Sequence, residues 1–289
     1  MTSDGMPNVL LAIYRYLVAE RSAPRQKIVQ VCAPSIVCRQ DRASSTLNTW
    51  LKLGLFTDGE GVIRLAPDAP RDESRLRTWL RSLIFRAENN EPFWGSEGVR
   101  SADFTRGLAW CLALDPFRLH GHGFKDVDAL ELDSLPREVE VFRNDTRWNG
   151  FKAWALFLGF AWQARYPKKY TLVVDPTPAI RDVLPTVFGA STELTQKDFL
   201  DRVRQPLPIL DGGTYRLLVE EELRPGHWPQ PQPDELSISL SLALRRLHVE
   251  GIIDFKDRAD PIAGRVNLVG RNGRRLAGVS HVVFKGVLA

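Results

Sequence analysis

The sequence has few cysteines, no long apolar run and no strong charge of either sign, and each shortage excludes a class of protein. The three cysteines, Cys32, Cys38 and Cys111, do not form a disulfide framework, and no CxxC-like pair supplies ligands for zinc. No apolar stretch approaches the roughly 20 residues that span a bilayer, and the first residues lack a basic leader. We therefore expect a cytoplasmic protein with no membrane partner and no metal or other cofactor.

Catalytic motifs are also missing. The sequence contains no phosphate-binding loop of the type GxxxxGKS/T, no GxGxxG after a strand, no HExxH and no GxSxG. His120 and His122 flank a glycine without a nearby carboxylate or cysteine cluster, a pattern typical of a loop. The strand-like run 138–140 is acidic, but no lysine follows it at the short spacing of metal-dependent nucleases. We expect a binding protein and not an enzyme.

The overall charge is mild, with 39 basic residues, 35 acidic residues and a net charge of +4. This balance permits nucleic-acid binding through local patches but does not establish it. From Gly251 to Ala289, seven Lys or Arg residues accompany three Asp residues, so the basic excess is concentrated at this end of the chain. The length of 289 residues predicts about two domains, or three small ones.

The clearest structural signal is a helix followed by a hairpin between Asp41 and Leu65. Gly54 ends the predicted helix, and short apolar pairs flank a polar tip at 58–61 that suits a two-stranded turn. Two further helices are predicted over 7–21 and from Pro24, and together these elements follow the plan of a winged helix-turn-helix. The apolar stripe of the last helix consists of Leu47, Trp50, Leu51 and Leu53.

A second module of the same kind is predicted near the other end. A helix over 236–250 is followed by Gly251 and by a hairpin that pairs 252–255 with 265–269, and a basic tail comes after it. Between the modules, apolar spacing predicts helices over 73–87, 101–114 and 148–162, a strand over 170–174 and a helix through Val187.

The sequence thus predicts a mainly α protein with small β-wings. N-terminal and C-terminal winged helix-turn-helix modules, residues 1–70 and 191–289, flank a central helical domain of residues 71–190.

Polar residues of both modules are candidates for DNA contact, because Arg, Asn and Gln can recognise base edges and Ser and Arg can hold phosphates. The alternative is a solvated helix face and a solvated basic tail. The charge distribution favours the C-terminal module for phosphate contact and leaves the first module to dock a partner. The candidates are Arg39, Gln40, Arg42, Ser44, Ser45 and Asn48 in the first module, and Arg245, Arg246, Lys256, Arg258, Arg265, Arg271, Arg274 and Arg275 in the second.

The run Met6–Leu10 leading into Ile13–Leu17, the length and the module order resemble the DpdG-type proteins. These are accessory components of a bacterial gene cluster that inserts a deazapurine base into DNA and restricts unmodified DNA. The resemblance implies a non-catalytic DNA-binding or scaffolding subunit of an anti-phage restriction complex. Its partners would be double-stranded DNA, other protein subunits of the complex and a second copy of the chain.

Two other interpretations remain open. The first is a tandem winged-helix accessory subunit of an SMC-type complex, which acts by protein–protein contacts and whose wings need not touch DNA. The second is a winged-helix transcription regulator, which the large middle region and the lack of an evident effector site disfavour.

Overall fold

The computed structural model of the protein describes residues 6–36, 40–94, 100–116, 123–166, 169–258 and 264–286. The chain forms two compact units, 1–105 with 142–158 and 106–141 with 159–289. Helices predominate and the strands form small antiparallel ladders, so the predicted mainly α class with small β elements is confirmed. The domain boundaries at 70 and 190 stay a prediction. Within the described ranges, no helix is both long and apolar enough to cross a membrane.

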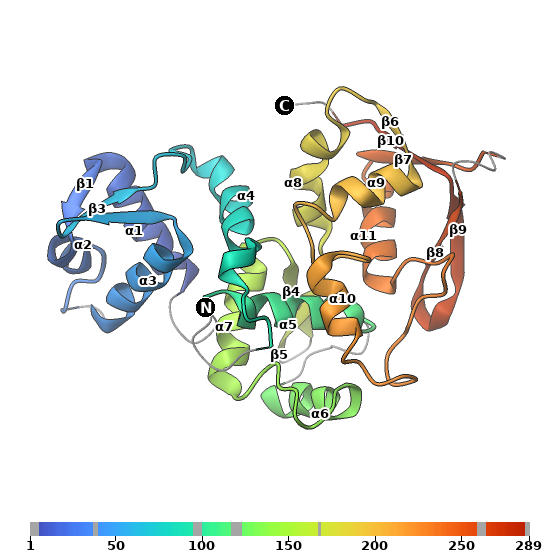
Figure 1. The fold of residues 1–289 in the computed structure, drawn as a ribbon, viewed down its shortest axis with the longest axis horizontal. Helices are drawn as coiled ribbons and strands as arrows, with labels where there is room; N and C mark the ends of the chain where they lie inside the picture. Colours follow the sequence, from blue (N-terminus) through green and yellow to red (C-terminus); the bar gives the residue numbers. More distant parts are fainter. Residues whose placement is uncertain are drawn as a thin grey trace. The chain divides into compact units, whose positions relative to one another are not determined.

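The first unit opens with three helices and three short strands, shown in blue in Figure 1. The strands form an antiparallel sheet in the order β1-β3-β2, and α1 packs against α2 and α3. Apolar residues of α1 and α3 are fully buried and form the core, among them Leu10, Ile13, Leu47 and Trp50. The elements are α1 (Pro7–Glu20), β1 (Ser22–Pro24), α2 (Arg25–Cys32), α3 (Gln40–Leu53), β2 (Phe56–Gly59) and β3 (Val62–Leu65).

The stop and the turn predicted in this segment are both confirmed. Gly54 has a φ of 92°, which favours glycine, and the amide of Leu55 donates to the carbonyl of Trp50 at 2.9 Å. Glu60 and Gly61 both have positive φ, as the central residues of a tight hairpin turn require, and they join β2 to β3. A polar tip therefore closes the hairpin.

The remainder of the first unit is helical. Trp154 of α7 lies 5.4 Å from Trp50 of α3, measured between ring centroids, so the two helices share a core. The Nδ2 of Asn89 donates to the buried carbonyls of Leu53 and Leu83, at 3.3 and 2.8 Å, near the ends of α3 and α4, where carbonyls lack a partner within the helix. The elements are α4 (Glu73–Ile84), η1 (Ala87–Asn89), the first residues of α5 (Ala102–Ala113) and α7 (Asp145–Phe157).

The second unit contains the rest of α5, α6 (Phe124–Ser134), the hairpin of β4 (Ala161–Tyr166) and β5 (Lys169–Val174), and α8 (Thr177–Phe188). The helix predicted over 148–162 is too long. It ends at Phe157 because Gly159, with a φ of 77°, turns the chain into β4. The run 138–140 is not a strand, and α6 was not predicted.

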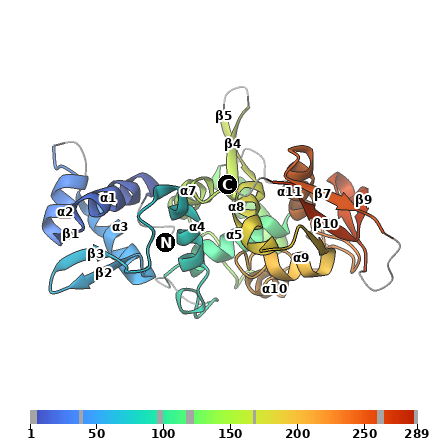
Figure 2. The same ribbon diagram turned by 90° about the horizontal axis from the view of Figure 1, so that it is seen from above.

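The order of the first six elements, and the order of the strands in their sheet, recur at the end of the second unit. We call residues 7–65 the first module and residues 177–284 the second module. In the second, α8, β6, α9, α11, β7 and β10 follow the order of α1, β1, α2, α3, β2 and β3, and the sheet order β6-β10-β7 matches β1-β3-β2 (Figure 1 and Figure 2). The further elements are β6 (Glu193–Thr195), α9 (Gln196–Val203), α10 (Thr214–Glu220), α11 (Ile238–Val249), β7 (Ile253–Lys256) and β10 (His281–Phe284).

The end of the third helix is also repeated. Gly251 has a φ of 73°, and the amide of Ile252 donates to the carbonyl of Leu247 at 3.0 Å, as Leu55 does to Trp50. With Gly54 and Gly251 taken as equivalent positions, each residue of α11 has a counterpart in α3 at the same distance from the glycine.

For the second module, the sequence predicted the wrong partner for the strand at 252–255. β7 pairs with β10, whereas β8 (Val266–Val269) pairs with β9 (Arg275–Val279) across η2 (Arg271–Gly273). The apolar run at 281–284 completes the sheet because Val282 is buried and aligned with Leu194 of β6. The residues predicted as a basic tail consequently lie in or beside a folded hairpin inserted between β7 and β10.

Candidate nucleic-acid interface

The third helix of the first module buries one face and exposes the other. Ala43, Leu47, Trp50 and Leu53 are buried against the module, as the helical spacing predicts. On the other side, Ser44 and Ser45 are partly exposed, and Asp41, Arg42, Asn48 and Lys52 are exposed. Of the predicted contacts in this module, Arg39 and the side chain of Gln40 lie outside the described residues. The other four, Arg42, Ser44, Ser45 and Asn48, fall on one open polar surface.

The first module carries exposed cations on α3 and on two other elements. Arg42 and Lys52 on α3, Lys27 on α2 and Arg64 on β3 are exposed, and none has an ion-pair partner among the residues that the structure describes. Three exposed acids oppose a polyanion here, Asp41 on the helix and Asp58 and Glu60 at the hairpin tip. The surface combines hydrogen-bonding side chains with cations, a set that can bind both base edges and phosphates.

Arg25 is a residue of this surface that the sequence did not identify. Its Nη1 donates to Oδ1 of Asn48 at 2.5 Å, and its Nη2 lies 3.9 Å from Oδ2 of Asp58 at the hairpin. No sequence pattern links α2, α3 and the hairpin in this way, because the three elements meet only after folding.

In the second module, the face of α11 that corresponds to the open face of α3 is buried. Ser239, the counterpart of Arg42, is 3% exposed and donates to the carbonyl of Leu112 on α5 at 2.5 Å. Ser241, the counterpart of Ser44, is 0% exposed and accepts a hydrogen bond from the amide of Val269 at 2.9 Å. The first two turns of α11 are therefore closed to a DNA groove, and only residues near its end are exposed, such as Arg245.

Most of the predicted cationic contacts of the second module are paired with carboxylates. Lys256 and Arg258 both contact Glu193, at 2.5 and 2.9 Å. Arg265 contacts Asp257 at 2.9 Å, and Arg246 pairs with Asp175. Arg271 is exposed on η2, and Arg245 and Arg274 are exposed without an ion-pair partner in the described part of the chain. Exposed pairs are individually weak, but each one lowers the positive potential available to phosphate.

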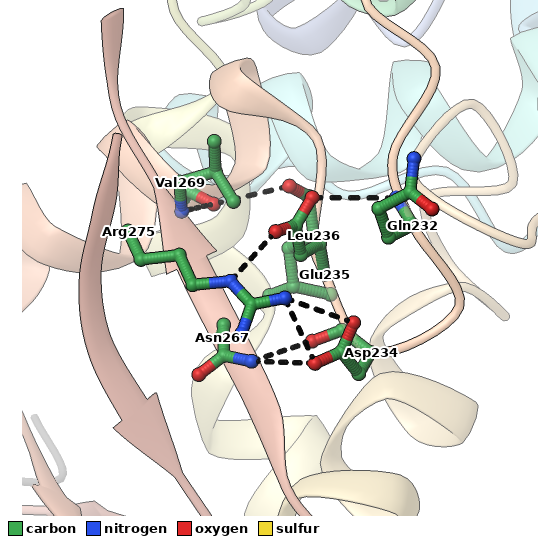
Figure 3. A network of polar contacts seen from close by, with 8 residues as sticks. Gln232, Asp234, Glu235, Leu236, Asn267, Val269 and Arg275 are labelled. Carbon is green, nitrogen blue, oxygen red and sulfur yellow. Dashed lines mark hydrogen bonds and ion pairs between the residues drawn. The ribbon is translucent and has the colours of Figure 1, made fainter. Parts of the chain in front are cut away.

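Arg275 belongs to the network shown in Figure 3, which joins β8 and β9 to the segment before α11. Its Nε donates to Oε1 of Glu235 at 2.9 Å, and its Nη2 donates to Oδ2 of Asp234 at 3.2 Å. The hydrogen bond to Glu235 and the charge of Asp234 raise the pKa of Arg275. Nδ2 of Asn267 donates to the same Asp234 carboxylate at 2.8 Å. This arginine therefore stabilises the inserted hairpin.

Ion pairing with two cations also changes the pKa of Glu193. The pKa of Glu193 lies below its usual range, chiefly because Lys256 donates a hydrogen bond to it, with a further contribution from the charge of Arg258. The carboxylate is thus held in its charged form beside the sheet β6-β10-β7.

The exposed end of α11 borders an apolar cavity of about 350 Å³ within the second unit. Trp162 of β4 is 41% exposed at this cavity, and Leu242, the counterpart of Ser45, lines it from α11. The Arg246 guanidinium lies 5.8 Å from the centroid of the Trp162 ring. Where α3 has a polar exposed face, α11 therefore borders an apolar cavity, and the ion pair of Arg246 with Asp175 lies at its rim.

The chain belongs to the DpdG-like family, whose model matches residues 1–261, and this confirms the resemblance identified in the sequence. Membership of the family associates the chain with the deazapurine DNA-modification cluster. No curated protein and no solved structure matches the chain.

Proposed function

We propose that this protein is a non-catalytic DNA-binding and scaffolding subunit of a bacterial anti-phage defence complex, and that its first module is a winged helix-turn-helix that contacts double-stranded DNA. The observation that carries the proposal is the open polar face of α3 with exposed cations around it. The order α1, β1, α2, α3, β2, β3 and the tight turn at the hairpin tip support the winged-helix assignment. Family membership supports the connection to DNA modification and restriction.

In this proposal α3 enters the major groove and β2–β3 lies along the backbone. Asn48, Ser44 and Ser45 face base edges, whereas Arg42 and Lys52 contact phosphates. The second module has a structural role, because the first two turns of α11 are buried and most of its predicted cationic contacts are paired. The chemistry of modification and restriction belongs to partner proteins.

The test compares charge reversal in the two modules by fluorescence anisotropy with a labelled duplex of mixed sequence. We expect Arg42→Glu with Lys52→Glu to weaken binding by more than about tenfold and to reduce the dependence of affinity on salt, because phosphate contacts are lost. Arg245→Glu is the matched control: it reverses an exposed arginine at the position of α11 that corresponds to Asn48. We expect it to change affinity by less than about twofold.

Circular dichroism establishes that each variant is folded. A larger loss with Arg245→Glu than with the α3 variant would assign DNA contact to the second module. Absence of duplex binding by the unmodified protein at low salt would overturn the DNA-binding function.

The cavity beside Trp162 supports a second candidate function, in which the second module holds a partner subunit through protein–protein contacts. An exposed tryptophan with an arginine over its ring is typical of the energetically important centre of an interface. The test is assembly with purified proteins encoded by the same cluster. Trp162→Ala should weaken assembly and leave duplex binding unchanged, and unchanged assembly would remove this candidate.

A further inference from the structure

The strongest unassigned feature lies within the first module, where one arginine joins three elements. The backbone amide of Arg25, the first residue of α2, donates to the carbonyl of Gly61 at 3.4 Å. Its Nη1 donates to Oδ1 of Asn48 on α3, and its Nη2 lies 3.9 Å from Asp58 on β2. Asp58 is itself fixed, because its Oδ1 accepts a hydrogen bond from the amide of Gly61 at 3.0 Å. Arg25 therefore couples the helix face to the hairpin.

The contact has a direct chemical consequence for Asn48. An asparagine amide has one oxygen that accepts and one nitrogen that donates two hydrogen bonds. Because Arg25 donates to Oδ1, the orientation of the amide is fixed and Nδ2 is left to donate elsewhere. Asn48 is exposed on α3, on the same open surface as Arg42 and Ser45. A free side chain at such a site would have to be ordered during binding, whereas this one is already ordered.

We propose that Arg25 is a positioning residue for base recognition, which holds Asn48 so that its Nδ2 donates to the N7 acceptor of a purine in the major groove. The inference rests on the proposed function of the first module. Purines present N7 in the major groove, and asparagine is a common partner of adenine at this edge. Arg25 acts through Asn48, and the phosphate contacts remain with Arg42 and Lys52.

The experiment is a double-mutant cycle in the full chain with Arg25→Gln, Asn48→Ala and the combined variant. A preferred duplex is first selected from a randomised pool with the unmodified protein, and the affinity of every variant for it is measured over a range of salt concentrations. We expect each single substitution to weaken binding about tenfold, and the combined variant to be no weaker than Asn48→Ala. The salt dependence should stay unchanged in all three, because no phosphate contact is lost.

Selection from the randomised pool with each variant gives a second readout, which a purely structural role would not change. Both single substitutions should relax the preference at the same base pair and leave the other positions of the selected site intact. Arg25→Lys keeps the charge and one donor, so it should recover part of the affinity and of the preference at that base pair. Thermal unfolding of each variant excludes loss of the folded module as the cause.

Two results would overturn the inference. The first is additive losses with a salt slope reduced by about one in Arg25→Gln, which would make Arg25 a phosphate contact. The second is an unchanged selected sequence in Asn48→Ala. Neither result removes the proposed function, which depends on the separate loss of binding in the Arg42→Glu and Lys52→Glu variant.

Discussion

The first module and the second module share the order of six elements, with α10 and the hairpin of β8 and β9 inserted in the second, yet the matched helices α3 and α11 have opposite surroundings. α3 exposes Arg42 and Asn48 and leaves Ser44 partly exposed, whereas the counterparts Ser239 and Ser241 on α11 are buried. The difference arises from what packs around each helix. Two neighbours of α11 have no counterpart beside α3: β8 of the inserted hairpin packs on it, and α5 accepts its hydrogen bond from Ser239, so its first two turns are covered.

The charges of the two modules differ in the same way. Residues 251–289 carry seven Lys or Arg and three Asp, but carboxylates pair with Lys256, Arg258, Arg265, Arg275 and Lys285. The first module, residues 7–65, carries eight Lys or Arg and four Asp or Glu, and its Arg42 and Lys52 are exposed without an ion-pair partner among the described residues. The number of cations in a segment is therefore a poorer guide to phosphate binding than the number that carry no carboxylate partner. Which module contacts DNA stays a prediction, and the structure favours the first.

The largest expected difference in stability comes from replacing a serine by arginine at matched positions of the two modules. Ser241→Arg places a charge in a fully buried site beside Val269, so it should destabilise the second module by about 3–5 kcal/mol. Ser44→Arg changes a partly exposed position and should alter stability by less than about 0.5 kcal/mol. Urea unfolding measures both. Equal effects would contradict the contrast between a closed and an open helix face.

A smaller loss of stability, similar in the two modules, is expected when either of two matched core leucines is replaced. Leu47 and Leu244 occupy equivalent positions of α3 and α11, and both are buried. Substitution of either by alanine leaves a cavity and should lower the free energy of unfolding of its own unit by about 2–5 kcal/mol. Hydrogen exchange measured by mass spectrometry localises each loss to one module. Protection lost throughout the chain with either variant would show that the two cores are not independent.

The smallest effect concerns pH and the ion pairs of the second module. The pKa of Glu193 is lowered by the hydrogen bond from Lys256 and by the charge of Arg258. Because the folded-state pKa lies below the unfolded one, this stabilisation is complete above the ordinary pKa of a glutamate and is lost as the pH falls through the lowered value. The stability difference between the unmodified protein and Glu193→Gln should therefore shrink in acid. Glu221→Gln, at an exposed glutamate, serves as the control. A difference that stays constant with pH would mean that the pair does not stabilise the sheet.

Much of the first module could be predicted because its signals are local. The apolar spacing around Leu47 and Trp50 predicts α3, Gly54 ends it, and the polar turn at 60–61 closes the hairpin. Each of these signals acts over a few residues, so a single sequence contains enough information. The mainly α class was confirmed for the same reason, and the family resemblance, which rested on a short run, the length and the module order, was confirmed as well.

The sequence predictions were wrong or incomplete where the structure depends on contacts between segments that are far apart in the chain. The run 266–269 is as strand-like as the run 281–284, and only the folded sheet selects the second as the partner of β7. The contact of Arg25 with Asn48 depends on how two helices meet. Likewise, the burial of Ser241 depends on the inserted hairpin, which no pattern within α11 reveals.

The position of β10 has a consequence for the order in which the chain folds during synthesis. β1 pairs Ser22 with Arg64, so the sheet of the first module can close soon after Leu65 has left the ribosome. β6 pairs Glu193 with Val283, and the inserted hairpin lies between β7 and its partner strand. Closing this longer loop costs more chain entropy and must wait for the last strand. The polar surface around α3 can therefore be fully folded while the second sheet still lacks its central strand.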